Sequence, residues 1–195
     1  MNHIEKMHVR IVKECGYYEA LLGLSFNHFQ QGQDMSELAL RLAHKDYGHN
    51  KFLESMIVWV DILAPRYWWV QADTYRLSTK QSESTMYIQR HGVSDLDFVH
   101  DVSQDYIYYL NELLRQDKLD EFKASLPEGF LQRRLWMFSY KTLRNIFIQR
   151  KNHKLPEWRL FLHKMLMNIE HPEFIVKNYK TWLEDNTIFS VVKGC

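Results

Sequence analysis

The spacing of apolar residues along this chain changes repeatedly between two periods, and this alternation limits the folds that it can adopt. Residues 7–14 and 54–63 are rich in β-branched or aromatic residues and largely alternate, which predicts β-strands. Helices are predicted where apolar residues recur three and four apart or a capping residue precedes them: 17–29, 35–45, 67–76, 94–116, 130–150, 157–169 and 173–185. Residues 77–85 carry many hydroxyl groups without apolar periodicity, which predicts a loop. The pattern therefore predicts an α+β protein, with a small mixed or antiparallel sheet packed against several long helices.

The length of the chain and its low content of Gly and Pro favour a single domain. A chain of 195 residues fits one domain or at most two small ones. With 7 Gly and 4 Pro, no low-complexity linker divides it, and no internal repeat is visible. We therefore expect a single domain over residues 1–195.

Charge and cysteine content exclude several classes of function. The formal net charge of +1 argues against a surface that coats nucleic acid. Cys15 and Cys195 form neither a disulfide framework nor a C-x-x-C zinc pair, which suits a reducing cytosol. The polar start, MNHIEKMHVR, does not resemble a signal peptide, and no apolar run approaches the ~18 residues that a membrane helix needs. We expect a cytoplasmic protein with no membrane and no nucleic-acid partner.

Aromatic residues make up 14% of the chain and have two interpretations. They can form a core built from large rings. They can also stack on a planar ligand, such as a base or a flavin, in a pocket.

Common catalytic and nucleotide-binding motifs are missing. H-E-x-x-H does not occur, and His44 and His49 lie five apart, the wrong spacing for one helical face, so no metal site is predicted. The P-loop, G-x-G-x-x-G and G-x-S-x-G motifs are missing as well. If the chain binds a nucleotide, side chains must hold the phosphate.

A polar stripe runs along the predicted helix at the end of residues 130–150. Lys141, Asn145 and Gln149 are spaced four apart and share one face. The stripe is either a solvated outer face or a surface that meets a ligand.

One segment resembles a known family. Residues 70–87, VQADTYRLSTKQSESTMY, are similar to the motif R-H-R-x-x-S-x-N-x-x-S-x-R-Y of the flavin-dependent thymidylate synthases, without a gap. Gln71 falls on the glutamine that precedes the motif, and Arg76 falls on its second arginine. Ser84 falls on the later serine and Tyr87 on the closing tyrosine.

Four further segments resemble the same family in the same order, over residues 24–150. They are LSF, YGHNKFLES, KASLPEGF and SYKTLRNIFIQR. The positions that match, or that replace arginine by lysine, are Ser25, Gly48, His49, Leu53, Glu54, Lys123, Lys141, Leu143, Asn145 and Arg150.

The resemblance implies a homotetramer with FAD held between subunits. It also implies that dUMP stacks on the flavin ring, that methylenetetrahydrofolate supplies a carbon and that NADPH reduces the flavin. The residues that it places at the FAD site are Ser25, His49, Glu54, Arg76, Lys141 and Asn145. Those that it assigns to the nucleotide are Gln71, Ser84, Lys123 and Arg150, and Ser84 and Arg76 are also assigned to the catalytic centre.

Five positions depart from the family pattern. The first motif arginine is Thr74, the motif histidine is Tyr75, and the arginine of S-x-R-Y is Met86. Ser55 and Ser139 replace a histidine and an asparagine. Losing two arginines weakens the binding of phosphorylated ligands unless other cations compensate. The nearby cations are Arg66, Lys80, Arg90 and Arg144.

Three hypotheses follow. The first is a flavin-dependent one-carbon transfer, similar to thymidylate synthesis, on a pyrimidine deoxynucleotide such as dUMP. The second is a nucleotide-binding or regulatory protein that keeps the fold without flavin chemistry. The third, a helical interaction protein, explains the aromatic residues but not the ordered matches.

Overall fold

The computed structural model describes residues 6–27, 33–84 and 91–187, which form two compact units. The first unit contains Asp61–Thr74 and Lys80–Leu135 together with the chain up to His8. The second contains Val9–Val60, Tyr75–Thr79 and the chain from Trp136 onward. The single domain expected over residues 1–195 stays a prediction.

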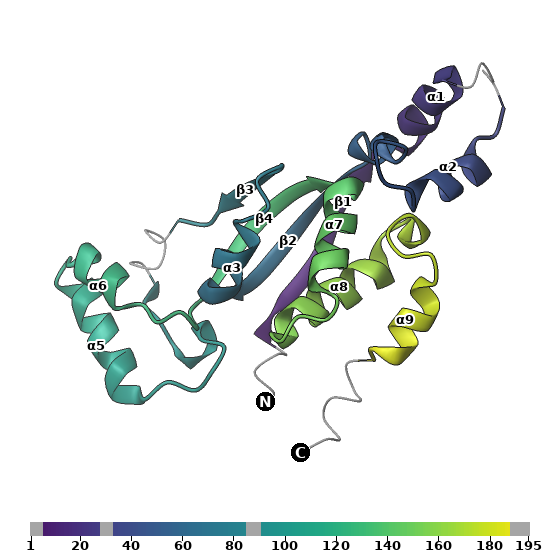
Figure 1. Ribbon diagram of the computed structural model, residues 1–195. Helices are drawn as coiled ribbons and strands as arrows, with labels where there is room; N and C mark the ends of the chain where they lie inside the picture. The colour runs from purple at the N-terminus through teal and green to yellow at the C-terminus, as the bar shows by residue number, and fades with distance from the viewer. Residues whose placement is uncertain (1–5, 28–32, 85–90, 188–195) are drawn as a thin grey trace. The chain divides into compact units, whose positions relative to one another are not determined.

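A four-stranded antiparallel sheet forms the β part of the described residues, in the strand order β1-β2-β4-β3 (Figure 1). Its strands are β1 (His8–Cys15), β2 (Ile57–Pro65), β3 (Ser78–Ser82) and β4 (Leu131–Ser139). Strand β2 lies between two neighbours, and its Val58, Val60 and Ile62 are fully buried. The predicted α+β class is confirmed.

Helices and short 3-10 turns make up the rest of both units. The second unit holds α1 (Tyr17–Asn27), α2 (Ser36–Ala43), η2 (Lys51–Glu54), α7 (Tyr140–Arg150), α8 (Pro156–Asn168), η5 (Pro172–Phe174) and α9 (Tyr179–Asp185). The first unit holds α3 (Arg66–Ala72), η4 (Asp95–Asp97), α5 (Gln104–Arg115) and α6 (Leu119–Ser125).

Aromatic rings build the core of the second unit. Trp136 and Phe138 of β4 are fully buried, and their ring centroids lie 4.8 Å apart. Phe161 of α8 lies 5.8 Å from Trp136 and stacks on it, and Trp158 meets Phe161 edge to face at 5.9 Å. These rings are therefore core residues, the first of the two interpretations of the aromatic content.

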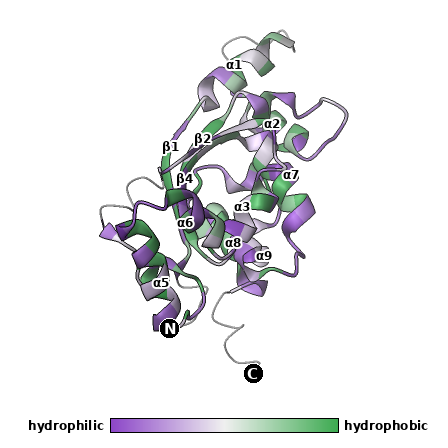
Figure 2. Ribbon diagram, turned by 90° about the vertical axis from the view of Figure 1, so that its left-hand side faces the viewer, coloured by the Kyte–Doolittle hydropathy of each residue, from purple (hydrophilic) through white to green (hydrophobic). Residues whose placement is uncertain are grey.

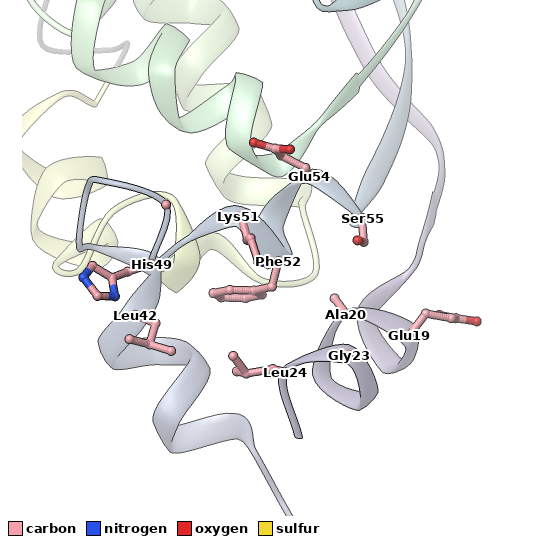
Figure 3. A pocket seen from close by; sticks show the side chains of 11 residues that line it. Glu19, Ala20, Gly23, Leu24, Leu42, His49, Lys51, Phe52, Glu54 and Ser55 are labelled. Atoms are coloured by element: carbon pink, nitrogen blue, oxygen red, sulfur yellow. The ribbon is translucent and has the colours of Figure 1, made fainter. Parts of the chain in front are cut away.

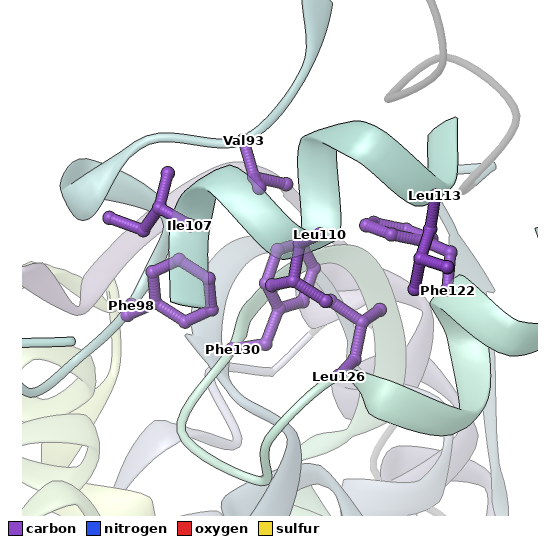
Figure 4. Close-up of a cluster of buried hydrophobic side chains, with 8 residues drawn as sticks. All are labelled: Val93, Phe98, Ile107, Leu110, Leu113, Phe122, Leu126 and Phe130. Atoms are coloured by element: carbon purple, nitrogen blue, oxygen red, sulfur yellow. The ribbon is translucent and has the colours of Figure 1, made fainter. Parts of the chain in front are cut away.

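The first unit has a smaller core of its own, in which α5 and α6 enclose a cluster of apolar side chains (Figure 4). Helix α5 carries hydrophobic and hydrophilic residues on different faces (Figure 2), and it buries Ile107, Leu110 and Leu113. Phe122 of α6, Leu126 and Phe130 complete the cluster from the following segment.

Two predictions about strands were wrong. The segment predicted as a loop, 77–85, contains strand β3, which lies at the edge of the sheet with most of its residues exposed. All residues of this edge strand are polar, so it has no apolar alternation to detect. The predicted helix 130–150 is strand β4 followed by α7, which begins only at Tyr140.

Several helix boundaries also differ from prediction. Helix α3 ends at Ala72, four residues before the predicted end. Ser94, expected to cap a helix over 94–116, forms a capping box around the 3-10 turn η4 instead. Helix α5 begins at Gln104 and is capped by Ser103, whose Oγ accepts from the Tyr106 amide. The tail predicted as helix over 173–185 is helical from Tyr179, after the 3-10 turn η5.

Candidate functional site

A pocket of about 520 Å³ lies in the second unit, between α1, the end of α2 and residues 48–55 (Figure 3). Leu24 of α1, Leu42 of α2 and Phe52 form its apolar wall. His49 and Glu54 line the same pocket. The structure therefore brings together two of the six residues that the family resemblance assigns to the FAD site.

Backbone geometry explains how residues 48–55 reach the pocket. Tyr47 and Gly48 have φ values of +59° and +87°, so the chain turns there, immediately before His49. Gly16 has φ +95°, and a Cβ on it would lie 2.0 Å from the carbonyl oxygen of Ser55. Only glycine permits the start of α1 to approach Ser55 so closely.

Asn50 is fully buried and ties this segment to its neighbours. Its Nδ2 donates to the carbonyl oxygen of Ala43 at 3.2 Å, at the end of α2. Its Oδ1 accepts from Nζ of Lys141 on α7. Lys141 does not line the pocket, but it holds the segment that supplies His49 and Glu54. Sequence reasoning missed Asn50, although it follows directly on the Gly48–His49 match.

Helix α7, which carries several predicted site residues, is anchored at its first turn. The Tyr140 hydroxyl donates to Oε2 of Glu14 on β1. Burial raises the pKa of both groups, and their hydrogen bond adds to the rise for Tyr140 while opposing it for Glu14. Ser139, one of the departures from the family pattern, caps the helix by accepting from the amide of Thr142 at 3.2 Å.

Arg150, at the end of α7, lies among aromatic rings. Its Nε donates to the Tyr75 hydroxyl at 2.9 Å, and Tyr75 in turn donates to Oε1 of Gln149 at 3.0 Å. The guanidinium lies 4.9 Å from the ring centroid of Trp158 and 5.7 Å from that of Tyr75. Tyr75, which replaces the motif histidine, is therefore a direct partner of the arginine that the resemblance assigns to the nucleotide.

The polar stripe of α7 lies partly against the protein. Asn145 and Gln149 are exposed, but Gln149 accepts from Tyr75 and Lys141 reaches Asn50. The stripe is thus more than a solvated outer face.

Two further residues assigned to the FAD site do not line the pocket. Ser25 is 2% exposed, and its Oγ donates to the carbonyl oxygen of Leu22 at 2.7 Å within α1. Arg76 is exposed, one residue after Tyr75. Their assignment, like that of Asn145, stays a prediction.

Three residues assigned to the nucleotide belong to the first unit. Gln71 is half-buried near the end of α3, and its carbonyl oxygen accepts from the hydroxyl of Thr74 at 2.7 Å. Ser84 is exposed after β3, and Lys123 is exposed on α6. Their role as nucleotide ligands stays a prediction. Met86, Tyr87 and Arg90 lie outside the described residues.

The other cations suggested as replacements have internal partners. Arg66 donates to the carbonyl oxygen of Leu126 at 2.9 Å. Lys80 lies 3.8 Å from the carboxylate of Asp73, and Arg144 lies 3.5 Å from that of Asp46.

An unpredicted cluster surrounds the same Asp73 in the first unit. Arg134 lies 4.7 Å over the ring of Trp69 and donates to Asp73 at 3.0 Å and to Gln132 at 2.7 Å. Burial lowers the pKa of Lys80 beside it. Sequence analysis missed this cluster because no motif contains these residues and because β4, which carries Gln132 and Arg134, was predicted as a helix.

The described ranges contain neither a candidate metal site nor a candidate membrane-spanning helix. No group of three or more His, Cys, Asp or Glu side chains there is arranged to hold a metal ion. No helix within those ranges is both long and apolar enough to cross a membrane.

Comparison with known proteins identifies the fold. No family model and no curated protein sequence matches the chain. Two crystal structures of thymidylate synthase X (ThyX) from Helicobacter pylori, each with FAD and dUMP, are similar. The first has a TM-score of 0.73 at 16% identity and covers 91% of this chain and 99% of its own. The second has a TM-score of 0.74 at 17% identity and covers 87% and 98%. The chain therefore has the fold of the flavin-dependent thymidylate synthases.

Proposed function

We propose that this protein is a flavin-dependent enzyme that transfers a one-carbon unit to a pyrimidine deoxynucleotide such as dUMP. The observation that carries the proposal is that His49 and Glu54 line one pocket in a chain with the ThyX fold. The two similar H. pylori structures contain FAD and dUMP. In this proposal the protein is a homotetramer, and methylenetetrahydrofolate and NADPH are cosubstrates.

The residues at the pocket suit part of a large, planar cofactor. Phe52, Leu24 and Leu42 offer an apolar wall, and His49, Lys51 and Glu54 are polar residues of the lining. Bound FAD would supply the hydride chemistry. The protein would bind and orient FAD through His49 and Glu54, with Lys141 and Asn50 holding their segment in place.

The nucleotide would be held by side chains. In this proposal Arg150 binds the phosphate, because a guanidinium can donate two parallel hydrogen bonds to it. Gln71, Ser84 and Lys123 complete the nucleotide contacts, Ser84 and Arg76 lie at the catalytic centre, and Ser25 and Asn145 contact FAD.

A spectroscopic titration tests the flavin directly. The purified protein, titrated with FAD, is expected to show bound-flavin absorbance that changes again when dUMP is added. His49→Ala should weaken FAD binding about tenfold, as expected for one lost polar contact and some packing. His8→Ala, at an exposed histidine of β1, should leave it unchanged. A wild-type protein that binds dUMP but no FAD would contradict the proposal and support the alternative below.

The alternative is a nucleotide-binding or regulatory protein that keeps the fold without flavin chemistry. The contact between Tyr75 and Arg150 favours it, because a tyrosine stands where the family has a histidine and bonds to the proposed phosphate ligand.

The hydroxyl of Tyr75 is expected to orient Arg150 for the nucleotide. Tyr75→Phe keeps the ring against Trp158 but removes the bonds to Arg150 and Gln149. A net hydrogen bond is worth about 0.5–1.5 kcal/mol, so dUMP affinity should fall about 3- to 10-fold by calorimetry. Tyr18→Phe, at a tyrosine that is 82% exposed, is the control. A tighter complex in Tyr75→Phe would show that Tyr75 competes with the phosphate.

A further inference from the structure

A second large pocket of the second unit, of about 630 Å³, is lined by α2, by the residues that follow α2 and by residues of η5 and the segment after it. Arg41, His44 and Lys45 line it from α2 and the residues that follow. Lys177 and Glu173 line it from the other segment. This pocket shares Leu42 with the proposed FAD pocket, but neither His49 nor Arg150 is among its lining residues.

The charge in this pocket is strongly unbalanced. Arg41, Lys45 and Lys177 form no ion pair within the described part of the chain. Glu37 lies one turn before Arg41 on α2, yet the two side chains are not paired. Glu173 is the one acidic residue of the lining, and its carboxylate lies 3.1 Å from Nδ1 of His171.

A buried arginine, paired with Asp46 at 3.5 Å, lies close enough to His44 to affect its charge. Arg144 is 8% exposed, and its Nε has no hydrogen-bond partner among the described residues. His44 donates from Nε2 to the carbonyl oxygen of Glu173 at 2.7 Å. Burial, followed by the charges of Arg144 and Lys177, holds the pKa of His44 below its ordinary value.

Helix electrostatics account for only part of this cluster. Cations at the C-terminal end of a helix interact favourably with its dipole, which explains Arg41 and Lys45. Lys177 comes from a different segment and is not near the end of a helix that it would stabilise. Its convergence with Arg41 and Lys45 on one cavity is better explained by an anion.

Leucine side chains in the same lining indicate that the anion has an apolar, organic part. Leu38, Leu40 and Leu42 line the same pocket, and Leu40 is 39% exposed. A cavity of this size is in the range of small-molecule sites, and its apolar side suits an organic group. We propose that this pocket binds a small organic phosphate that carries at least two negative charges, with its phosphates on Arg41, Lys45 and Lys177 and its organic part on the leucines.

Calorimetry with ADP as the probe tests this site in the full chain at low ionic strength. ADP is expected to bind with a Kd below about 1 mM and more tightly than inorganic pyrophosphate. Arg41→Ala and Lys177→Ala should each weaken ADP binding about tenfold, as expected for a lost charge-assisted contact. Lys13→Ala, at an exposed lysine of β1, should change it less than about twofold because Lys13 does not line the pocket.

The outcomes separate this site from the proposed active site and from other ligands. Arg150→Ala should leave ADP binding intact; if it abolished that binding, ADP would be occupying the proposed nucleotide site. Equal losses in Lys13→Ala and Lys177→Ala would show nonspecific charge attraction and overturn the proposal. If pyrophosphate bound as tightly as ADP, the proposal that the ligand has an organic part in contact with the leucines would be wrong. Binding to anionic phosphatidylserine vesicles without binding ADP would assign the pocket to a membrane surface instead.

Discussion

Replacing Arg150 by alanine is expected to abolish dUMP binding while leaving the protein folded. A hydrogen bond to a charged group contributes about 1.5–3 kcal/mol, and a guanidinium can make two such bonds to a phosphate, so affinity should fall by at least about 100-fold. The side chain lies at the last turn of α7, where Tyr75 and Trp158 already fix its position. Calorimetric titration with dUMP measures the loss, and circular dichroism checks the fold.

Two further variants show whether the loss of affinity is specific to the guanidinium of Arg150. Arg150→Lys keeps the charge but not the two-pronged geometry, so it should retain part of the affinity. Lys151→Ala removes an exposed charge from the next position and should bind dUMP nearly as tightly as the wild type. Unchanged affinity in Arg150→Ala would show that Arg150 serves only the α7–α8 junction, through Tyr75 and Trp158, and would remove the phosphate ligand from the proposal.

The local sequence pattern predicted those elements that carry a clear apolar period or a clear start signal. Strand β2 was recognised because its segment is rich in β-branched and aromatic residues and alternates from Met56 onward, and α8 because Pro156 marks its start. Strand β4 was mistaken for helix because Leu135, Trp136, Met137 and Phe138 follow one another without either period. Its strand state comes from pairing with β2 and β3, which no short window of sequence contains.

The candidate site was predictable only where the resemblance named residues. His49 and Glu54 were assigned in this way, and the structure places both on one pocket. Tyr75 was counted as a lost histidine, because its bond to Arg150 joins residues 75 positions apart. Asn50 and the cluster around Arg134 depend on similarly distant partners, so sequence spacing carried no signal for them.

A large loss of stability is expected from Phe122→Ala in the core of the first unit. Phe122 is fully buried between α5 and the segment that ends at Phe130 (Figure 4). Helix α6 has only seven residues, too few to be stable alone, so it depends on this side chain. Deleting a buried phenyl ring typically costs about 3–5 kcal/mol, and we expect that loss in the free energy of unfolding by urea denaturation. Lys123→Ala, at the exposed neighbouring position, should change it by less than about 0.5 kcal/mol. If Phe122→Ala instead gave early protease cleavage within α5 and α6 with an unchanged main urea transition, this cluster would unfold separately from the rest of the chain.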